Sequence, residues 1–471
     1  MTEHEAGPTP PDFNRRDFIR STATFGSLMA LMGGIPLLAE DATNALPAET
    51  NYSPEEPPVS CAIIGCGQWG REILNTLATL VNKKGEALAP VLAVCDNYAS
   101  ILRRIKKDLP PAVATFDDYH KVLELKDVAV VIVATPSHLH KEIVIAALQA
   151  GKHVYCEAPL ASNIEDARAI AQAAKAAVKL NFQAGLQMRA DPAKLYIYNK
   201  FIRAGATGSP VYGRAQWHQR ASWRQPGSTP EREKALNWRL DSTTSSGLAG
   251  ELGVHQIDLM TWFLGHRPAV INGWGAMLAW DDGRDVADTV QALLEYPGHV
   301  NFTWDATLAS TFEADYNMYY GSYATVMMRE SKAWLFKETD SPLLGWELYA
   351  ARQKFGKDDG ISLSADATHS TKSTKPGEES PYENSALHHS LKAFLHNSRV
   401  VTTGVADFAA NFDITDTDAL RESLNTPIML KTYAKAAGYK DGFEATVIAI
   451  KTNEAIAKNS KIKVDDAWFE I

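Results

Sequence analysis

Two groups of residues in this sequence have types and spacing suited to chemistry. The first spans Gly65–Gly70 and reads G-C-G-Q-W-G, the spacing of a dinucleotide-binding turn between a strand and a helix. In this interpretation Gly65 makes the tight turn, Gly67 lets the backbone approach a pyrophosphate, and Gly70 lets the helix pack on the strand. The phosphates would bind the free N–H groups of the helix start, at Gln68 and Trp69. A glycine-rich turn that binds no ligand is the alternative.

Two further positions complete the predicted cofactor site. Asp96 follows the apolar run 91–95, where a carboxylate accepts hydrogen bonds from the adenosine ribose and repels a 2′-phosphate, so NAD(H) is favoured over NADP(H). Thr135 and Pro136 end another apolar run, and we expect them to flank the cofactor. His138 is counted with them, although a structural role at a helix start is an equal alternative for His138 and His140.

The second group is Glu251 and His255, which are candidates for catalysis. Four residues apart on a helix, they would share a face. An imidazole with its ordinary pKa of about 6.5 suits a general base that takes a proton from a sugar hydroxyl. Glu251 would then orient the ring or contact a substrate hydroxyl. The alternative is a structural histidine capped by Glu251.

A third set of residues is a candidate for substrate binding. The segment 217–239 is rich in Trp and Arg, and we expect Trp238 and Arg239 to stack on and hydrogen-bond a sugar. The same composition suits an oligomer interface, which has equal weight. Arg189 would either bind substrate or pair with a carboxylate. The histidines lack the spacing of metal ligands, so no metal site is expected.

The elements that must position these residues fall into two domains. Alternating apolar strands and helical segments over 58–185 predict a doubly wound parallel sheet, a Rossmann domain that binds the dinucleotide. Residues 186–471 predict an α+β domain for substrate and oligomerisation. Its expected helices are at 191–203 and 250–264, its expected antiparallel strands are at 211–220, 270–280, 288–296 and 299–307, and a surface loop is expected at 355–385.

The N-terminal 48 residues predict a leader and linker. Arg15, Arg16 and Phe18, followed by an uncharged run, resemble a twin-arginine export signal, so we expect a periplasmic protein that binds its cofactor before export. A single membrane anchor is the alternative, but the run contains Gly33, Gly34 and Pro36. No later apolar stretch predicts a membrane span.

Composition narrows the possible functions further. The net charge of −9 argues against a nucleic-acid partner. The four cysteines all lie in the first third of the chain and predict buried free thiols.

Four motifs occur in the order typical of one family: Gly65–Gly70, Ala134–His140, Glu157–Pro159 and Glu251–Asp258. In these motifs the chain resembles the Gfo/Idh/MocA oxidoreductases, which include glucose–fructose oxidoreductases and inositol dehydrogenases. The resemblance implies a Rossmann domain followed by a domain with an open, mainly antiparallel sheet that supports homo-oligomer contacts. It also implies a sugar, cyclitol or sugar derivative as substrate.

The chain departs from the family pattern at two positions. Members commonly carry Glu-Lys-Pro where this sequence has Glu157-Ala158-Pro159, and the lysine there helps bind substrate and transfer a proton. Ala158 can do neither, although it still marks the substrate site, and Glu157 is expected beside the nicotinamide. Glu251 stands where members often have aspartate.

Three functions remain open. The first is an NAD-dependent oxidoreductase with tightly held cofactor. The second is a redox-neutral NAD-dependent glycosidase or epimerase. The third is a nucleotide-binding member of the family without turnover.

Overall fold

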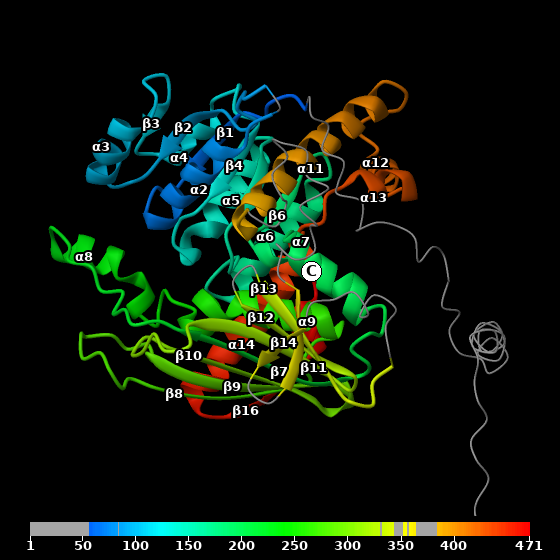
Figure 1. Cartoon of the computed structure of the whole chain (residues 1–471). Coiled ribbons are helices and arrows are strands. Elements are labelled where there is room, and N and C mark those ends of the chain that lie inside the picture. Colours follow the sequence, from blue (N-terminus) through cyan, green and yellow to red (C-terminus); the bar gives the residue numbers. More distant parts are fainter. Residues whose placement is uncertain (1–55, 83, 330–331, 343–351, 356–357, 364–383) are drawn as a thin grey trace, which may run out of the picture. The chain divides into compact units, whose positions relative to one another are not determined.

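The computed structural model describes residues 56–82, 84–329, 332–342, 352–355, 358–363 and 384–471. The predicted leader and its twin-arginine motif lie outside these residues. Within them, two sheets organise the chain, and each is described below with the helices that pack on it (Figure 1).

The first sheet has six parallel strands in the order β3-β2-β1-β4-β5-β6. Strands β1, β4 and β5 are buried along their whole length, which explains their nearly continuous apolar sequences, because helices cover both faces of such a sheet. The predicted doubly wound sheet is confirmed. The strands are β1 (Cys61–Ile64), β2 (Val91–Cys95), β3 (Ala114–Phe116), β4 (Val130–Val133), β5 (His153–Cys156) and β6 (Phe182–Ala184).

Helices connect these strands in the order that a parallel sheet requires. They are α2 (Gln68–Thr79), α3 (Ala99–Asp108), α4 (Tyr119–Leu123), the 3₁₀ turn η1 (Ser137–Leu139), α5 (His140–Gln149) and α6 (Ile164–Ala176). The C-terminal part of the chain adds α11 (Ala386–Ala409), whose Leu391 and Phe394 share a buried apolar cluster with Ile63 and Ile132. A face of the first sheet is therefore completed by a helix far along the sequence.

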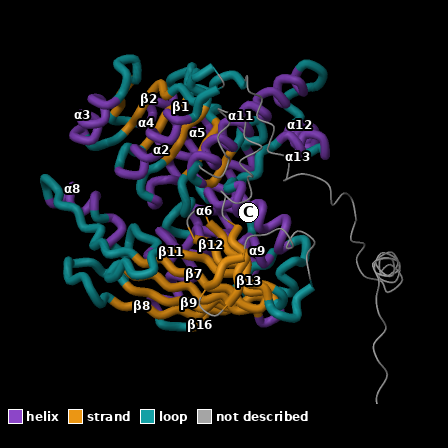
Figure 2. Tube along the Cα trace, viewed as in Figure 1, coloured by secondary structure: helices purple, strands orange, loops and turns teal. Residues whose placement is uncertain are grey.

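The second sheet has ten strands in the order β14-β15-β13-β12-β11-β7-β10-β9-β8-β16 (Figure 2). All its neighbours are antiparallel except β7 and β10, which run parallel. The predicted mainly antiparallel sheet is confirmed. Its strands are β7 (Pro210–His218), β8 (Val270–Ala276), β9 (Thr289–Tyr296), β10 (Val300–Thr307), β11 (Asp315–Gly321), β12 (Ala324–Arg329), β13 (Lys332–Lys337), β14 (Arg352–Phe355), β15 (Asp358–Leu363) and β16 (Lys461–Lys463).

Helix α14 (Tyr439–Lys458) joins the two sheets into one core. Near its start, a Cβ at Gly442 would meet Ala184 of β6 at 2.6 Å. Near its end, Ile456 lies where a Cβ on Gly273 of β8 would stand. The two sheets are thus packed through a common helix. Among the other helices of this part are α7 (Pro192–Ile197), η3 (Tyr198–Ile202), α8 (Pro230–Leu236), η5 (Ala249–Gly253), α9 (Val254–Leu264), α12 (Thr417–Leu424) and α13 (Pro427–Thr432).

The structure corrects two expectations about these elements. The expected helices at 191–203 and 250–264 each contain a π-helical turn, at η3 and η5. The expected loop at 355–385 begins instead with strands β14 and β15, and residues 364–383 lie outside the described part.

The four cysteines Cys61, Cys66, Cys95 and Cys156 are buried and free, as predicted. In the part of the chain that the structure describes, no helix is both long and apolar enough to cross a bilayer. Within the same residues, no three His, Cys, Asp or Glu side chains are grouped as metal ligands would be.

Candidate functional site

The glycine turn lies between β1 and α2, at the carboxyl end of the first sheet. Gly65 has a φ of +95°, and a Cβ there would stand 2.6 Å from the backbone of Ala134. A Cβ at Gly70 would stand 2.0 Å from the carbonyl oxygen of Gly65, so both positions are fixed by packing. A Cβ at Gly67 would meet no atom within 4 Å. The chain therefore does not need glycine at position 67 for its own packing, and the open space there fits a pyrophosphate.

Asp96 connects this turn to the end of β2. Its carboxylate accepts the backbone N–H of Cys66 at 2.9 Å and that of Tyr98 at 2.9 Å. A carboxylate has about four lone-pair positions, so acceptor capacity remains for ribose hydroxyls. The residue predicted to hold the ribose also shapes the phosphate-binding turn.

The two histidines after β4, whose roles the sequence left open, have different surroundings. His140 is buried, and its ring nitrogens lie 2.9 Å from the carbonyl oxygen of Thr135 and 3.2 Å from those of Pro159 and Leu160. His140 is therefore structural. The Nδ1 atom of His138 has no hydrogen-bond partner among the described residues, and its ring lies 5.7 Å from that of Trp238.

Buried polar atoms without a hydrogen-bond partner lie along the predicted cofactor site. The hydroxyl of Thr135 and the Oε1 atom of Glu157 are both buried and lack partners among the described residues. Burial raises the pKa of Glu157 to about 7, although hydrogen bonds from Trp69 and the Ala158 backbone oppose this shift. Unsatisfied buried groups are rare in folded proteins and indicate a missing ligand or water. The residues present thus fit a dinucleotide.

Glu251 lies on η5 and joins the two parts of the chain. Its carboxylate accepts hydrogen bonds from the hydroxyls of Ser137 at 3.1 Å and Ser246 at 2.8 Å, and it pairs with Arg239 at 3.3 Å. Its side chain is only 3% exposed. The expectation that Glu251 orients or caps His255 is wrong, because the π-helical turn directs the carboxylate to these other groups.

His255 is the second residue of α9, two residues after the π-helical turn ends. Among the described residues, none makes a hydrogen bond to its imidazole. Burial lowers the pKa of His255 to about 4, so the ring is neutral near pH 7. The ring can still accept a proton, but a pKa of about 4 makes it a weaker base at pH 7 than the ordinary imidazole expected from the sequence. His255 stays the candidate base on its position alone.

Of the two alternatives for Arg189, its contacts favour pairing with a carboxylate over binding substrate. Its guanidinium forms a fork with the buried Asp258, at 2.8 Å and 2.9 Å, and a third nitrogen lies 2.8 Å from Asp441. Its remaining face lies 5.7 Å from the ring of Trp262. Arg189 thus anchors α9 and α14 beside the site.

The Trp- and Arg-rich segment is divided between two places. Arg239 lies over the ring of Trp238 at 4.4 Å and near Trp223 at 5.7 Å, close to Glu251. His218, by contrast, pairs with Asp305 at 2.6 Å on the second sheet. Only the Trp223–Arg239 end therefore belongs to the candidate site, where Arg239 is 47% exposed.

Sequence reasoning missed three contributors to this site. Ser137 follows Thr135-Pro136 directly, so its place at the end of β4 was a usable signal. Ser246 gave no such signal, because its contact depends on the π-helical turn. Tyr98, two residues after Asp96, contacts Arg232 of α8 across 134 residues of sequence, which no local pattern reveals.

Family models match two successive parts of the described chain. Residues 59–185 match "Oxidoreductase family, NAD-binding Rossmann fold", and residues 198–326 match "GFO/IDH/MocA C-terminal domain". Together the two ranges cover more than half of the sequence. The chain belongs to the Gfo/Idh/MocA family of NAD-binding oxidoreductases.

Individual relatives agree with this assignment. Levoglucosan dehydrogenase of Pseudarthrobacter phenanthrenivorans is 35% identical over 154 residues, 32% of this chain and 37% of its own length. Inositol 2-dehydrogenase of Salmonella paratyphi B is 30% identical over 208 residues, 44% of this chain and 54% of its own. The matches thus span about a third to a half of these relatives.

A solved structure shows the same fold. Scyllo-inositol dehydrogenase of Lactobacillus casei, solved with NAD(H) and scyllo-inositol, has a TM-score of 0.56 at 18% identity, over 86% of this chain and 99% of its own.

Proposed function

We propose that this protein is an NAD(H)-dependent oxidoreductase that acts on a sugar, a cyclitol or a related polyol. The observation that carries the proposal is the glycine turn, in which Gly65 and Gly70 are packed but Gly67 faces open space beside Asp96. The free N–H groups of α2 suit a pyrophosphate, and Asp96 suits the adenosine ribose and disfavours a 2′-phosphate.

The residues around this groove have separable roles in the proposed reaction. Gly67, Gln68 and Trp69 would hold the pyrophosphate end, while Thr135 and Pro136 would flank the nicotinamide. A bound nicotinamide supplies the acceptor or donor of a hydride. His255 would take the proton of the substrate hydroxyl on an unpartnered ring nitrogen, which burial keeps neutral at pH 7.

The substrate class follows from the groups that face this site. Trp238 is buried beneath Arg239, against the expectation that its ring stacks on a sugar. Arg239 is 47% exposed and offers hydrogen-bond donors for hydroxyls. The names of the relatives, which are dehydrogenases of inositol and levoglucosan, support a ring-shaped polyol as the substrate.

Ala158 favours a second candidate function, a family member that binds the nucleotide without turnover. Its side chain packs against the apolar core and brings no amine to the site. The two candidates differ in whether bound nucleotide responds to a substrate.

The absorbance of the purified protein at about 340 nm distinguishes the two candidates. NAD-loaded protein is mixed with a panel of inositols and anhydrosugars. Growth of the reduced-nicotinamide band that is lost in the His255→Ala variant supports the oxidoreductase. A wild-type protein that binds NADH but responds to no polyol supports the second candidate, and an Ala158→Lys variant that gains the response identifies the missing amine as the cause.

We further propose that the chain is exported by the twin-arginine route and self-associates through its second sheet. Export is supported by Arg15, Arg16 and Phe18. Self-association is supported by the exposed Trp274 and Leu293 on β8 and β9. An Arg15→Lys/Arg16→Lys variant retained in the cytoplasm, and light-scattering mass above that of one chain, are the expected results.

A further inference from the structure

Residues 222–240, here called the strap, connect the second sheet to the first domain. The strap contains α8 (Pro230–Leu236), which Figure 1 shows as a short helix outside the second sheet. Its middle contacts Tyr98, which follows β2, and its C-terminal end contacts His138, which follows β4. The role of these contacts rests on the proposed binding of a dinucleotide.

One contact lies at the adenosine side of the predicted groove. The guanidinium carbon of Arg232 stands 3.6 Å from the ring centroid of Tyr98, and the Tyr98 hydroxyl lies 3.4 Å from that of Ser228. Tyr98 donates its backbone N–H to Asp96, the residue that suits the adenosine ribose. Adenine is bonded to that ribose, so it must lie within reach of the Arg232–Tyr98 pair.

The other contact lies on the far side of the glycine turn. Trp238 packs against His138, and Arg239 pairs with Glu251, which also binds Ser137. These groups follow β4, whereas Tyr98 follows β2. In the sheet order, β1 stands between β2 and β4, so the strap passes over the end of β1, where the glycine turn lies.

The length of α8 matches this crossing. Two strands separated by one neighbour lie about 10 Å apart. A helix of seven residues is about 10 Å long. The length of α8 is therefore comparable to the separation of β2 and β4.

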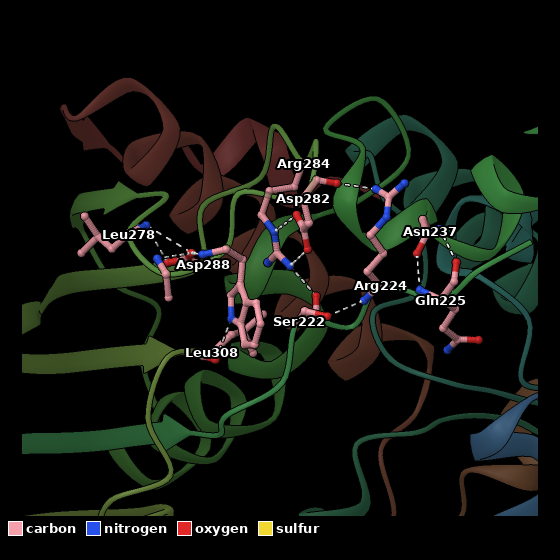
Figure 3. A network of polar contacts seen from close by, with 11 residues as sticks. Ser222, Arg224, Gln225, Asn237, Leu278, Asp282, Arg284, Asp288 and Leu308 are labelled. Carbon is pink, nitrogen blue, oxygen red and sulfur yellow. Dashed lines mark hydrogen bonds and ion pairs between the residues drawn. The ribbon is translucent and has the colours of Figure 1, made fainter.

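The strap is braced rather than loose (Figure 3). The side-chain amide of Asn237 makes two hydrogen bonds of 2.8 Å to the backbone of Gln225. Its Oδ1 accepts from the Gln225 N–H, and its Nδ2 donates to the Gln225 carbonyl oxygen. Arg224 pairs with Glu233 at 2.5 Å and donates to the carbonyl oxygen of Asp282. These bonds close the strap on itself and tie it to the loop after β8.

That loop is itself fixed. Arg284 is almost fully buried and forms a fork with Asp282, while also donating to the carbonyl oxygen of Ser222. Burial opposes ionisation of Asp288, but the backbone N–H groups of Leu278, Ala279 and Trp280 hold its pKa below the usual value. Opening the strap would break several of these bonds together.

One donor on the strap has no acceptor. The Nε atom of Arg232 is buried and lacks a hydrogen-bond partner among the described residues. A planar guanidinium both stacks on aromatic rings and donates to acceptors at its edge. A purine edge or a ribose oxygen beside Tyr98 would satisfy this donor.

We propose that the strap closes over the adenosine half of the dinucleotide and that Arg232 is a binding residue for that half. Cofactor release then requires the braced strap to open, which makes the nucleotide a retained group instead of an exchanging substrate.

The test compares ligands that contain different halves of the cofactor. Binding of NADH, ADP-ribose and reduced nicotinamide mononucleotide is measured calorimetrically with the full chain and with Arg232→Ala, Arg232→Lys and Tyr98→Leu variants. Arg214→Ala is the matched control, because Arg214 lies over Tyr316 on the second sheet, away from the groove. Melting temperature reports folding of each variant.

We expect Arg232→Ala to weaken ADP-ribose by roughly 5- to 150-fold, which corresponds to about 1–3 kcal/mol for a lost stacking partner. Tyr98→Leu should give a similar loss, and Arg232→Lys a smaller one. The mononucleotide should bind as in the wild type, and NADH should dissociate faster in a stopped-flow chase.

Equal weakening of both half-ligands, or none, overturns the strap proposal while wild-type binding of NADH still supports the proposed function. A wild-type chain that binds none of the three ligands refutes both.

Discussion

Alanine substitutions at Gly67 and Gly70 are expected to affect two different properties of the protein. At Gly67 the backbone has φ −62° and ψ −163°, which alanine can adopt, and the added methyl group meets no atom within 4 Å. At Gly70 the same methyl group would stand 2.0 Å from the carbonyl oxygen of Gly65. The first substitution therefore leaves packing intact, whereas the second forces α2 and β1 apart.

The expected magnitudes follow from these distances. Gly67 is the N-cap of α2, where alanine in place of glycine costs up to about 1 kcal/mol. Overpacking against backbone at Gly70 costs about 1–3 kcal/mol or more. A methyl group at position 67 instead occupies the space assigned to the pyrophosphate, so NADH affinity should fall at least about tenfold, or 1.4 kcal/mol.

Two measurements separate these effects. Urea unfolding of nucleotide-free protein gives the stability of each variant, and quenching of tryptophan fluorescence gives the dissociation constant for NADH. Gly67→Ala should move the binding constant and hardly the unfolding midpoint, while Gly70→Ala should move the midpoint. NADH affinity of Gly67→Ala equal to that of the wild type would refute the assignment of this turn to the pyrophosphate.

Three further predictions concern buried charges. The pKa of Glu157 is raised to about 7 in the fold, from about 4.5 when unfolded, so the folded state loses stability as pH rises between these values. Glu157→Gln should remove that loss of about 3 kcal/mol. Urea unfolding measured between pH 4.5 and 8 checks this. Arg189→Met should cost about 3–5 kcal/mol by leaving Asp258 buried without its cation, with much of the loss recovered when Asp258→Leu is added, and failure of this rescue would contradict the pairing role. Glu251→Ala should cost about 1–3 kcal/mol in thermal unfolding, since the hydroxyl of Ser137 and two other donors lose their acceptor, and an unchanged melting temperature would show that these bonds are not stabilising.

The first domain was largely predictable because its signals are local. A parallel strand buried on both faces must be apolar throughout, and the run at Val130–Val133 reads that way. The Gly65–Gly70 spacing likewise depends on sterics within six residues. Strand β3 escaped prediction because it has only three residues, all half-buried, and so carries little pattern.

Contacts between distant residues set the limit of prediction in the site. Arg189 finds its carboxylates 69 and 252 residues further along the chain, so its spacing could not decide between substrate and ion pair. The strap is a similar case, because Arg232 meets Tyr98 only when both sheets are assembled. The predicted contact between Glu251 and His255 is wrong for another reason. The four-residue spacing rule assumes an α-helix, and the π-helical turn η5 changes where the carboxylate points.

The contacts of Glu251 give a physical reason for glutamate at this position. Its carboxylate reaches Ser137 at the end of β4 and Arg239 on the strap, so it links the first sheet, the strap and the start of α9. An aspartate would be shorter by one carbon–carbon bond, about 1.5 Å, and would leave the 3.1 Å contact to Ser137 beyond hydrogen-bonding distance. In the proposed reaction His255 is the residue assigned to take the proton of a substrate hydroxyl, because Glu251 is engaged in this way and Ala158 carries no ionisable group. Loss of turnover in Glu251→Asp should therefore appear as weaker substrate binding, whereas loss in His255→Ala should appear in the chemical step.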